Sequence, residues 1–158
     1  MIINQTHLKN IRKKFNSITF TAGCWNLLHP GHIYLLKQCA QKGKIVVVSV
    51  SHDKITTRDK RVPVINQRQR MYILDNVRLV DFVILEEAKT PPNNIKNILR
   101  KLKPNKFVIG EDNANLKVYL GLCKELGIPI KLIKRNREGI FNISTTSIID
   151  SINSKKRK

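Results

Sequence analysis

The chain of 158 residues has few acidic residues, few cysteines and no long apolar run. No stretch offers the roughly 20 apolar residues that cross a bilayer, and residues 1–15 carry charges where a secretory signal needs an apolar segment. There is also no internal repeat and no low-complexity linker. These absences argue against membrane-spanning and secreted proteins, so we expect one soluble domain in the cytoplasm, without a membrane partner.

The three cysteines, Cys24, Cys39 and Cys123, are widely spaced and form no C-x-x-C pair. An odd, scattered set fits neither a disulfide framework nor a structural zinc site. We therefore expect reduced thiols that pack as small apolar residues.

The scarcity of acid leaves a large positive charge. Eleven Asp and Glu residues stand against 30 Lys and Arg, which gives a formal net charge of +19. Such a field concentrates nucleotides, sugar phosphates, nucleic acids and acidic lipids alike. The basic residues are scattered without interleaved aromatics, and a chain rich in Lys, Asn and Ile can reflect an AT-rich coding sequence, so we expect no nucleic-acid partner. The one compact basic run ends the chain, and residues 154–158 are expected to form a frayed tail.

Apolar and β-branched runs alternate with helical patterns along the chain. After an N-terminal extension over 1–16 with a short helix, strands are expected at 18–23, 45–50, 82–85, 107–109 and 128–133. Helices are expected at 30–42, 67–77, 91–102, 115–126 and 144–152, with Gly43 and Gly127 as stops and Ser144 as the cap of the last one. This alternation predicts that residues 1–158 form one Rossmann-like, doubly wound α/β domain, with a five-stranded parallel sheet and helices on both faces.

The segment 22–32, AGCWNLLHPGH, carries the clearest chemical signal. A glycine ends the first strand, and His29 and His32 then stand three positions apart at the start of a helix. This spacing puts both imidazoles on one side of the first turn, where free N–H groups and the helix dipole favour an anion. No third ligand is placed nearby for zinc. The segment therefore predicts a phosphate receptor for nucleotidyl transfer, where preorganised donors stabilise charge on the reacting phosphate.

On this H-P-G-H segment the chain resembles the cytidylyltransferase-like superfamily, whose hallmark is H-x-G-H. The resemblance runs from about residue 18 to residue 152, and further family segments follow in order at 49–53, 58–64, 69–70, 80–83 and 142–149, the last as I-S-T-T-x-I. The T-P, K-P and G-x-D segments at 90–91, 103–104 and 110–112 resemble the adenylyltransferase half of bacterial ADP-heptose synthase.

The resemblance implies a set of site residues. The catalytic set is His29, His32, Arg137, Ser144 and Thr145; the nucleotide-binding set is Ala22, Gly23, Cys24, Trp25, Gly31, Gly110, Asp112 and Thr146; the substrate-binding set is Asn26, Asp53, Arg61 and Arg135. Which of Arg135 and Arg137 binds phosphate is left open, because the distance to Ser144 is longer than the family pattern has it. No protein metal ligand is expected, since Mg²⁺ is held mainly by the triphosphate.

Several positions depart from the family pattern. Asn26 stands where the family has Asp, Trp25 where it has Phe, and Asp59 near an expected Lys. Asn105 and Asn142 replace an Asp and a Gly. If the Asp only orients the turn, Asn26 can serve; if its charge sets a histidine tautomer, activity drops.

The expected function is transfer of a nucleoside monophosphate from an NTP to a phosphorylated small molecule, with release of pyrophosphate. The branch resemblance favours ATP and a sugar 1-phosphate. A CTP-dependent enzyme acting on glycerol or ethanolamine phosphate and an archaeal-type FAD synthase are the enzymatic alternatives. An inactive, basic nucleic-acid-binding relative is the alternative from another class. Dimers are common in the resembling family, so the resemblance allows a homodimer, but no interface can be read from the sequence.

Overall fold

The structure, a computed structural model, describes residues 1–41, 44–58 and 62–155. Gly43, Asp59 and the predicted substrate-binding Arg61 lie outside these ranges, as do the last three residues of the basic tail. A five-stranded parallel sheet forms the centre, in the order β3-β2-β1-β4-β5. Its strands are β1 (Ile18–Gly23), β2 (Ile45–Val50), β3 (Phe82–Leu85), β4 (Lys106–Gly110) and β5 (Ile130–Ile133).

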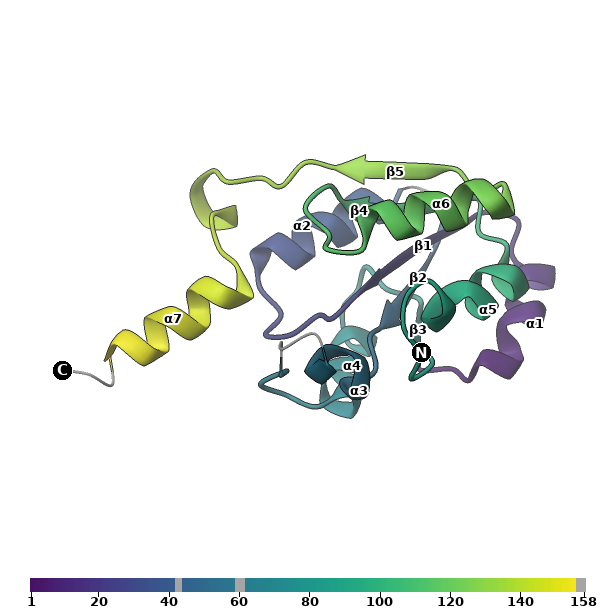
Figure 1. Ribbon diagram of the computed structural model, residues 1–158. Helices are drawn as coiled ribbons and strands as arrows, with labels where there is room; N and C mark the ends of the chain where they lie inside the picture. The colour runs from purple at the N-terminus through teal and green to yellow at the C-terminus, as the bar shows by residue number, and fades with distance from the viewer. Residues whose placement is uncertain (42–43, 59–61, 156–158) are drawn as a thin grey trace.

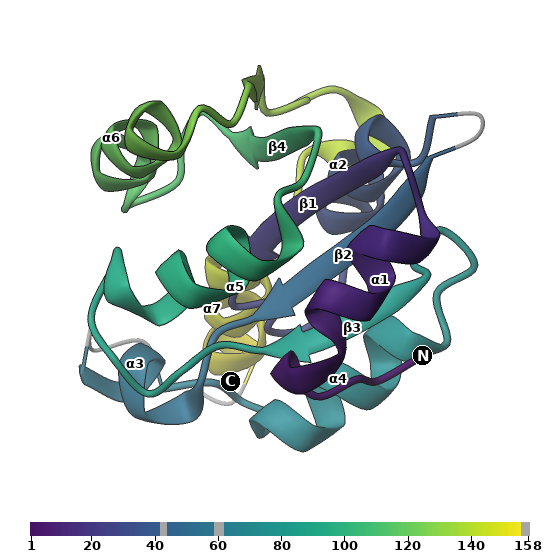
Figure 2. The ribbon, with the colours of Figure 1, turned by 90° about the vertical axis from the view of Figure 1, so that its right-hand side faces the viewer.

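The helices lie on both faces of this sheet, as predicted (Figures 1 and 2). They are η1 (Gln5–His7), α1 (Leu8–Lys14), α2 (Pro30–Cys39), α3 (Asp53–Arg58), α4 (Gln67–Asp75), α5 (Asn93–Leu102), α6 (Leu116–Leu126), η2 (Gly139–Phe141) and α7 (Thr145–Lys155). Helices α1, α5 and α6 share one buried apolar cluster with the strands, and α2 and α4 share another.

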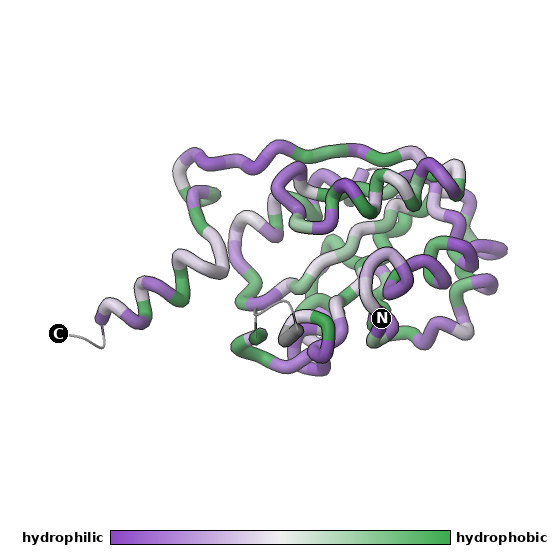
Figure 3. Tube along the Cα trace, in the orientation of Figure 1, coloured by the Kyte–Doolittle hydropathy of each residue, from purple (hydrophilic) through white to green (hydrophobic). Residues whose placement is uncertain are grey.

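The strands are apolar on both sides because each side meets a helical layer. On β2, Val47 belongs to the cluster of α1, α5 and α6, whereas Val46, Val48 and Val50 belong to the cluster of α2 and α4. The tube in Figure 3 shows the resulting apolar centre. β-Branched residues suit a strand that is buried on both faces.

Several element boundaries differ from the expected ones. Helix α2 ends at Cys39, α4 ends at Asp75, α5 begins at Asn93, and β5 begins at Ile130. Pro129 explains the late start of β5, because proline has no N–H to donate to a ladder.

Two further elements correct the sequence prediction. Helix α3 was missed, since its six residues follow β2 directly and are too few for a periodic pattern. The expected frayed tail begins too early, because α7 continues through Lys155. The Ser144 hydroxyl accepts a hydrogen bond from the Ser147 amide at 3.0 Å, so the cap predicted for this helix is confirmed.

The strand order reverses between β1 and β4, which pair with each other in the middle of the sheet. In sheets of this kind ligands bind outside the carboxyl ends of the strands at this point. The turn that leaves β1 lies there, and α7 projects from the body close to the same edge (Figure 1). None of the residues of α7 is buried.

Candidate active site

The turn between β1 and α2 is an unusual backbone path held by a buried indole. Trp25 and Leu27 adopt positive φ angles of 57° and 48°, which non-glycine residues rarely do. The Trp25 indole N–H donates to the carbonyl of Ser49 at 2.9 Å, and its ring packs 5.3 Å from the ring of His32. Trp25 was predicted to bind nucleotide. In the structure its side chain is buried and fixes this turn.

Backbone amides fix the rings of the two histidines at the start of α2. The amide of Gly31 donates to Nδ1 of His29 at 3.1 Å, and the amide of His29 donates to Nδ1 of His32 at 3.4 Å. The ring centroids are 3.9 Å apart. Because a neutral imidazole has one acceptor and one donor nitrogen, each ring must carry its proton on Nε2. Each histidine therefore keeps one N–H with which to bind an anion.

Both imidazoles are neutral at pH 7. Burial, followed by the neighbouring His29, lowers the pKa of His32 to about 3. Burial and then the Arg135 guanidinium lower the pKa of His29. The pair can thus donate hydrogen bonds to phosphate oxygens without forming a permanent ion pair, which suits a transient charge.

Gly31 leaves open the space beside these rings. A Cβ at this position would lie 3.0 Å from Cε1 of His29 and 3.6 Å from the carbonyl oxygen of Ile143. A side chain would therefore push the His29 ring out of place. Glycine therefore lets the His29 ring lie this close to the backbone without a shift.

The start of α7 meets the β1 turn. The Thr145 hydroxyl donates to the carbonyl of Asn26 at 2.7 Å, across 119 positions of sequence. Arg135 donates to the carbonyl of Ile143 at 3.1 Å and pairs with Asp112 at 3.5 Å. These contacts bring the segments that follow β1, β4 and β5 to one edge of the sheet.

Other predicted residues lie less directly at this edge. Ser144 is half-buried and its hydroxyl is engaged with Ser147, whereas Thr146 is exposed. Arg137 is also exposed and makes no ion pair with any described residue. The structure therefore brings Arg135, and not Arg137, beside the histidines.

The predicted substrate-binding Asp53 has a structural position. Its carboxylate accepts from the buried Arg70 guanidinium and from the amide of Gln67 at 3.0 Å. Arg70, which is 1% exposed, also donates to the carbonyls of Cys24 and Ser51. One buried guanidinium thus ties the loop after β1 to the loop after β2. Only the family resemblance pointed to Arg70, because a charged side chain is rarely expected in a core.

The predicted contribution of Asn26 is also clarified. Its Oδ1 accepts from the amide of Val64 at 3.0 Å, so the side chain orients the turn. Backbone amides, and not residue 26, set the tautomers of His29 and His32. In this arrangement the two tautomers do not depend on a charge at residue 26.

Glu86, which the sequence analysis missed, is a buried acid just beyond β3. It is 2% exposed and accepts from Asn94 Nδ2 at 2.7 Å and from Ser49 Oγ at 3.4 Å. Burial raises the pKa of the Glu86 carboxyl to about 7. A single acidic residue after a strand gives no sequence signal that separates it from an exposed one.

The remaining predicted nucleotide-binding residues line the ends of β1 and β4. Ala22 is buried, Gly23 and Cys24 are half-buried, and a Cβ on Gly110 would lie 2.9 Å from Asp112 Oδ1.

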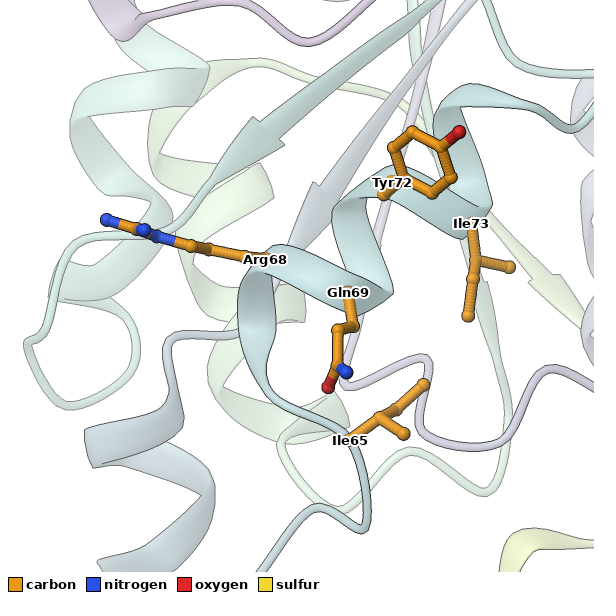
Figure 4. A pocket seen from close by; sticks show the side chains of 5 residues that line it. All are labelled: Ile65, Arg68, Gln69, Tyr72 and Ile73. Atoms are coloured by element: carbon orange, nitrogen blue, oxygen red, sulfur yellow. The ribbon is translucent and has the colours of Figure 1, made fainter.

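An apolar pocket of about 520 Å³ lies elsewhere, on α4, and contains none of the predicted site residues (Figure 4). In the described part of the chain no three His, Cys, Asp or Glu side chains gather as metal ligands, and no helix is long and apolar enough for a membrane span.

These features define a Rossmann-like α/β protein whose first strand-to-helix turn presents two neutral imidazoles. A family model described as Cytidylyltransferase-like matches residues 20–151, and the chain belongs to this family of nucleotidyltransferases.

Curated relatives agree with this assignment. The chain is 33% identical over 164 residues to the bifunctional protein HldE of Helicobacter pylori, covering 96% of this chain and 33% of that protein. It is 33% identical over 149 residues to HldE of Desulfatibacillum aliphaticivorans, covering 92% of this chain and 29% of that one. The chain thus spans about a third of the length of these relatives.

Two solved structures share the fold. The lipopolysaccharide core biosynthesis protein of Thermoplasma volcanium has a TM-score of 0.62 at 22% identity, covering 78% of this chain and 98% of that one. Pantoate-beta-alanine ligase of Francisella tularensis, complexed with beta-gamma ATP and beta-alanine, has a TM-score of 0.63 at 20% identity. The match covers 96% of this chain and 76% of that one. The Rossmann-like prediction is therefore confirmed.

Proposed function

We propose that this protein transfers the adenylyl group of ATP to a sugar 1-phosphate and releases pyrophosphate. The observation that carries the proposal is the pair of neutral imidazoles, His29 and His32, each with Nε2–H left to donate at the start of α2. Neutral, fixed donors suit an α-phosphate whose charge grows only as the reaction proceeds.

The chemistry is one in-line displacement. An oxygen of the sugar phosphate forms a bond to the α-phosphorus, and the bond from that phosphorus to the bridging oxygen of pyrophosphate breaks. The electron pair leaves with pyrophosphate, so no covalent enzyme intermediate is needed. His29 and His32 donate to the phosphate oxygens, which carry more charge in the transition state than in bound ATP.

Arg135 is the cation we assign to the departing phosphates. Its guanidinium lies close enough to lower the pKa of His29, and only a 3.5 Å pair with the half-exposed Asp112 engages its Nη1. A planar fork matches phosphate oxygens in pairs. Thr145 holds α7 on the β1 turn, and the hydroxyl of Ser144 lies at the start of the same helix. Helix N–H groups there add further donors.

The choice of ATP and a sugar phosphate rests on resemblance. The T-P and G-x-D segments are similar to those of the adenylyltransferase half of ADP-heptose synthase, and the curated relatives are HldE proteins. Mg²⁺ enters with the triphosphate as part of the substrate. Asp53 is not free to hold it, because its carboxylate is engaged by Arg70. A homodimer stays a prediction.

Pyrophosphate release tests the proposal. The protein is assayed with each of the four common NTPs against a panel of sugar 1-phosphates, glycerol phosphate, ethanolamine phosphate and flavin mononucleotide. We expect turnover with ATP and a sugar 1-phosphate, lost in His32→Ala and kept in His7→Ala, whose ring is exposed in η1. Turnover with CTP and glycerol or ethanolamine phosphate, or with ATP and flavin mononucleotide, would replace the proposed substrates. No turnover with any pair would contradict the enzyme itself.

A further inference from the structure

Several lysines that are far apart in the sequence lie on elements that meet near the amino ends of the strands, whereas the histidine pair lies at the carboxyl ends. Helices α1 and α5 lie side by side there, facing the viewer in Figure 2. Six residues of these helices and of the segment that enters β4 form what we call the amino-end lysine patch: Lys9, Lys13, Lys14, Lys101, Lys103 and Lys106.

The α1 part of the patch is one exposed helical face. Lys9 and Lys13 are four positions apart and therefore project from the same side of the helix. Both are exposed, as is Lys14, whose ammonium also lies 5.4 Å from the ring centroid of Phe15. No acidic residue occurs in α1 to neutralise these charges.

Hydrogen bonds fix this helix against the second part of the patch. The Arg12 guanidinium donates to Asn105 Oδ1 at 3.1 Å, and the same oxygen accepts from the amide of Ile18 at 2.9 Å. Asn105 stands between Lys103 and Lys106, so the lysines that follow α5 are anchored beside the end of α1. Lys103 is exposed, and its backbone is left-handed at the end of α5.

The patch lies in an unusually acid-free part of the molecule. The sequence contains no Asp or Glu over residues 1–52 or over residues 88–110. The nearby Glu125 on α6 is already engaged by Lys96 at 2.9 Å and by Arg100 at 3.3 Å. The positive field of the patch is therefore not cancelled by carboxylates on the helices that carry it.

We propose that the amino-end lysine patch binds the phosphate backbone of a nucleic-acid duplex, without sequence preference. The expectation from the sequence was that scattered basic residues indicate no nucleic-acid partner. The proposal departs from it because the fold places these six lysines on elements that contact one another. Cations alone suffice to bind a duplex backbone through counterion release.

The composition of the patch favours a duplex over a protein partner, an inserted bilayer or a single strand. The exposed large apolar side chains of the described chain lie outside α1, α5 and residues 103–106. The patch therefore lacks the apolar anchors that most protein interfaces and bilayer-inserting surfaces use. It also lacks an exposed aromatic on which an unpaired base could stack, as Phe15 is half-buried.

The test compares two triple charge reversals with equal net charge. The patch variant carries Lys13→Glu, Lys14→Glu and Lys103→Glu. The control carries Lys37→Glu, Lys54→Glu and Lys117→Glu, three exposed lysines on α2, α3 and α6. Binding to a labelled DNA duplex of about 20 base pairs is followed by fluorescence anisotropy at several salt concentrations. Pyrophosphate release by the patch variant reports on the separate nucleotidyltransferase site.

We expect the patch variant to bind the duplex at least about tenfold more weakly than the control. The slope of its log binding constant against log salt concentration should be shallower by about 3. Its pyrophosphate release should match that of the unmodified protein. Equal losses in both variants would overturn the proposal, because a general field and not the patch would then bind. Patch-dependent binding to phosphatidylserine vesicles without duplex binding would also overturn it. A protein that binds the duplex but releases no pyrophosphate would contradict the proposed function alone.

Discussion

The two ends of the sheet meet phosphate in different ways. At the carboxyl ends, His29 and His32 are neutral, and backbone amides fix both rings. At the amino ends, the lysines of the patch are charged, mostly exposed and held by few bonds. A fixed neutral donor selects a phosphate in one position. A flexible cation attracts phosphate at long range, and this attraction weakens as the salt concentration rises. The net charge of the chain therefore accounts for the lysine patch at the amino ends and says little about the histidine pair at the carboxyl ends.

A buried cation underlies the rigidity of the carboxyl edge. Replacing Arg70 by Ala should destabilise the carboxyl edge of the sheet more than any other change proposed here, because Arg70 donates to Asp53 and to the carbonyls of Cys24 and Ser51. Although Asp53 is partly exposed, removing the buried guanidinium leaves a cavity and two carbonyl groups without their donor, which together cost about 3–5 kcal/mol. We expect a loss of this size in the free energy of unfolding, measured by urea titration. Arg68→Ala on the exposed side of the same helix is the control and should change it by less than about 0.5 kcal/mol. Equal effects would mean that Arg70 does not carry the edge.

Replacing His32 by Ala removes a donor and leaves the edge folded. We expect kcat to fall by about 10²–10³-fold, the usual cost of one lost transition-state donor, with the unfolding transition measured in parallel. Because the pKa of His32 is lowered to about 3, kcat of the unmodified protein should not decline through protonation of this ring between about pH 8 and pH 6. An NMR titration that gives His32 an ordinary pKa would contradict the neutral pair.

The sequence predicted the fold well because its signals are local. The β-branched run of β2, the Gly127 stop and the Ser144 cap each act within a few residues, and all appear as expected. Missing pieces depended on tertiary context. Helix α3 is only six residues long, so its existence depends on the bonds between Asp53, Gln67 and Arg70 and not on a periodic pattern.

The candidate site was predictable only in part, for the same reason. The pairing of His29 with His32 follows from their spacing, and the approach of Thr145 followed from family resemblance. The engagement of Asp53 by Arg70 and the burial of Glu86 could not be read from spacing, because each depends on residues from separate elements. The choice between Arg135 and Arg137 likewise depends on where the chain turns after β5.

Glu86, just beyond β3, allows a test of the carboxyl edge of the sheet by pH. The folded protein holds the Glu86 proton up to about pH 7, whereas an unfolded glutamate loses it near 4.5. Stability should therefore fall as the pH rises through that window. Glu86→Gln removes the charge, so we expect it to stabilise the protein by about 2 kcal/mol at pH 8 and to have little effect at pH 4. Thermal melts across this range measure it, with Glu87→Gln as the neighbouring control. A benefit that does not depend on pH would contradict the raised pKa.

The smallest expected effect separates two arginines that are two positions apart. Both side chains are exposed, but Arg135 donates to Ile143 and lies near His29, whereas Arg137 makes neither contact. Charge-assisted hydrogen bonds contribute about 1.5–3 kcal/mol, part of which solvent exposure removes here. We therefore expect Arg135→Ala to lower kcat/KM for the nucleotide by roughly tenfold, and Arg137→Ala to leave it within about twofold. The measurement is steady-state pyrophosphate release with ATP varied. The reverse order of effects would return phosphate binding to Arg137 and show that the loop after β5 changes path when the nucleotide binds.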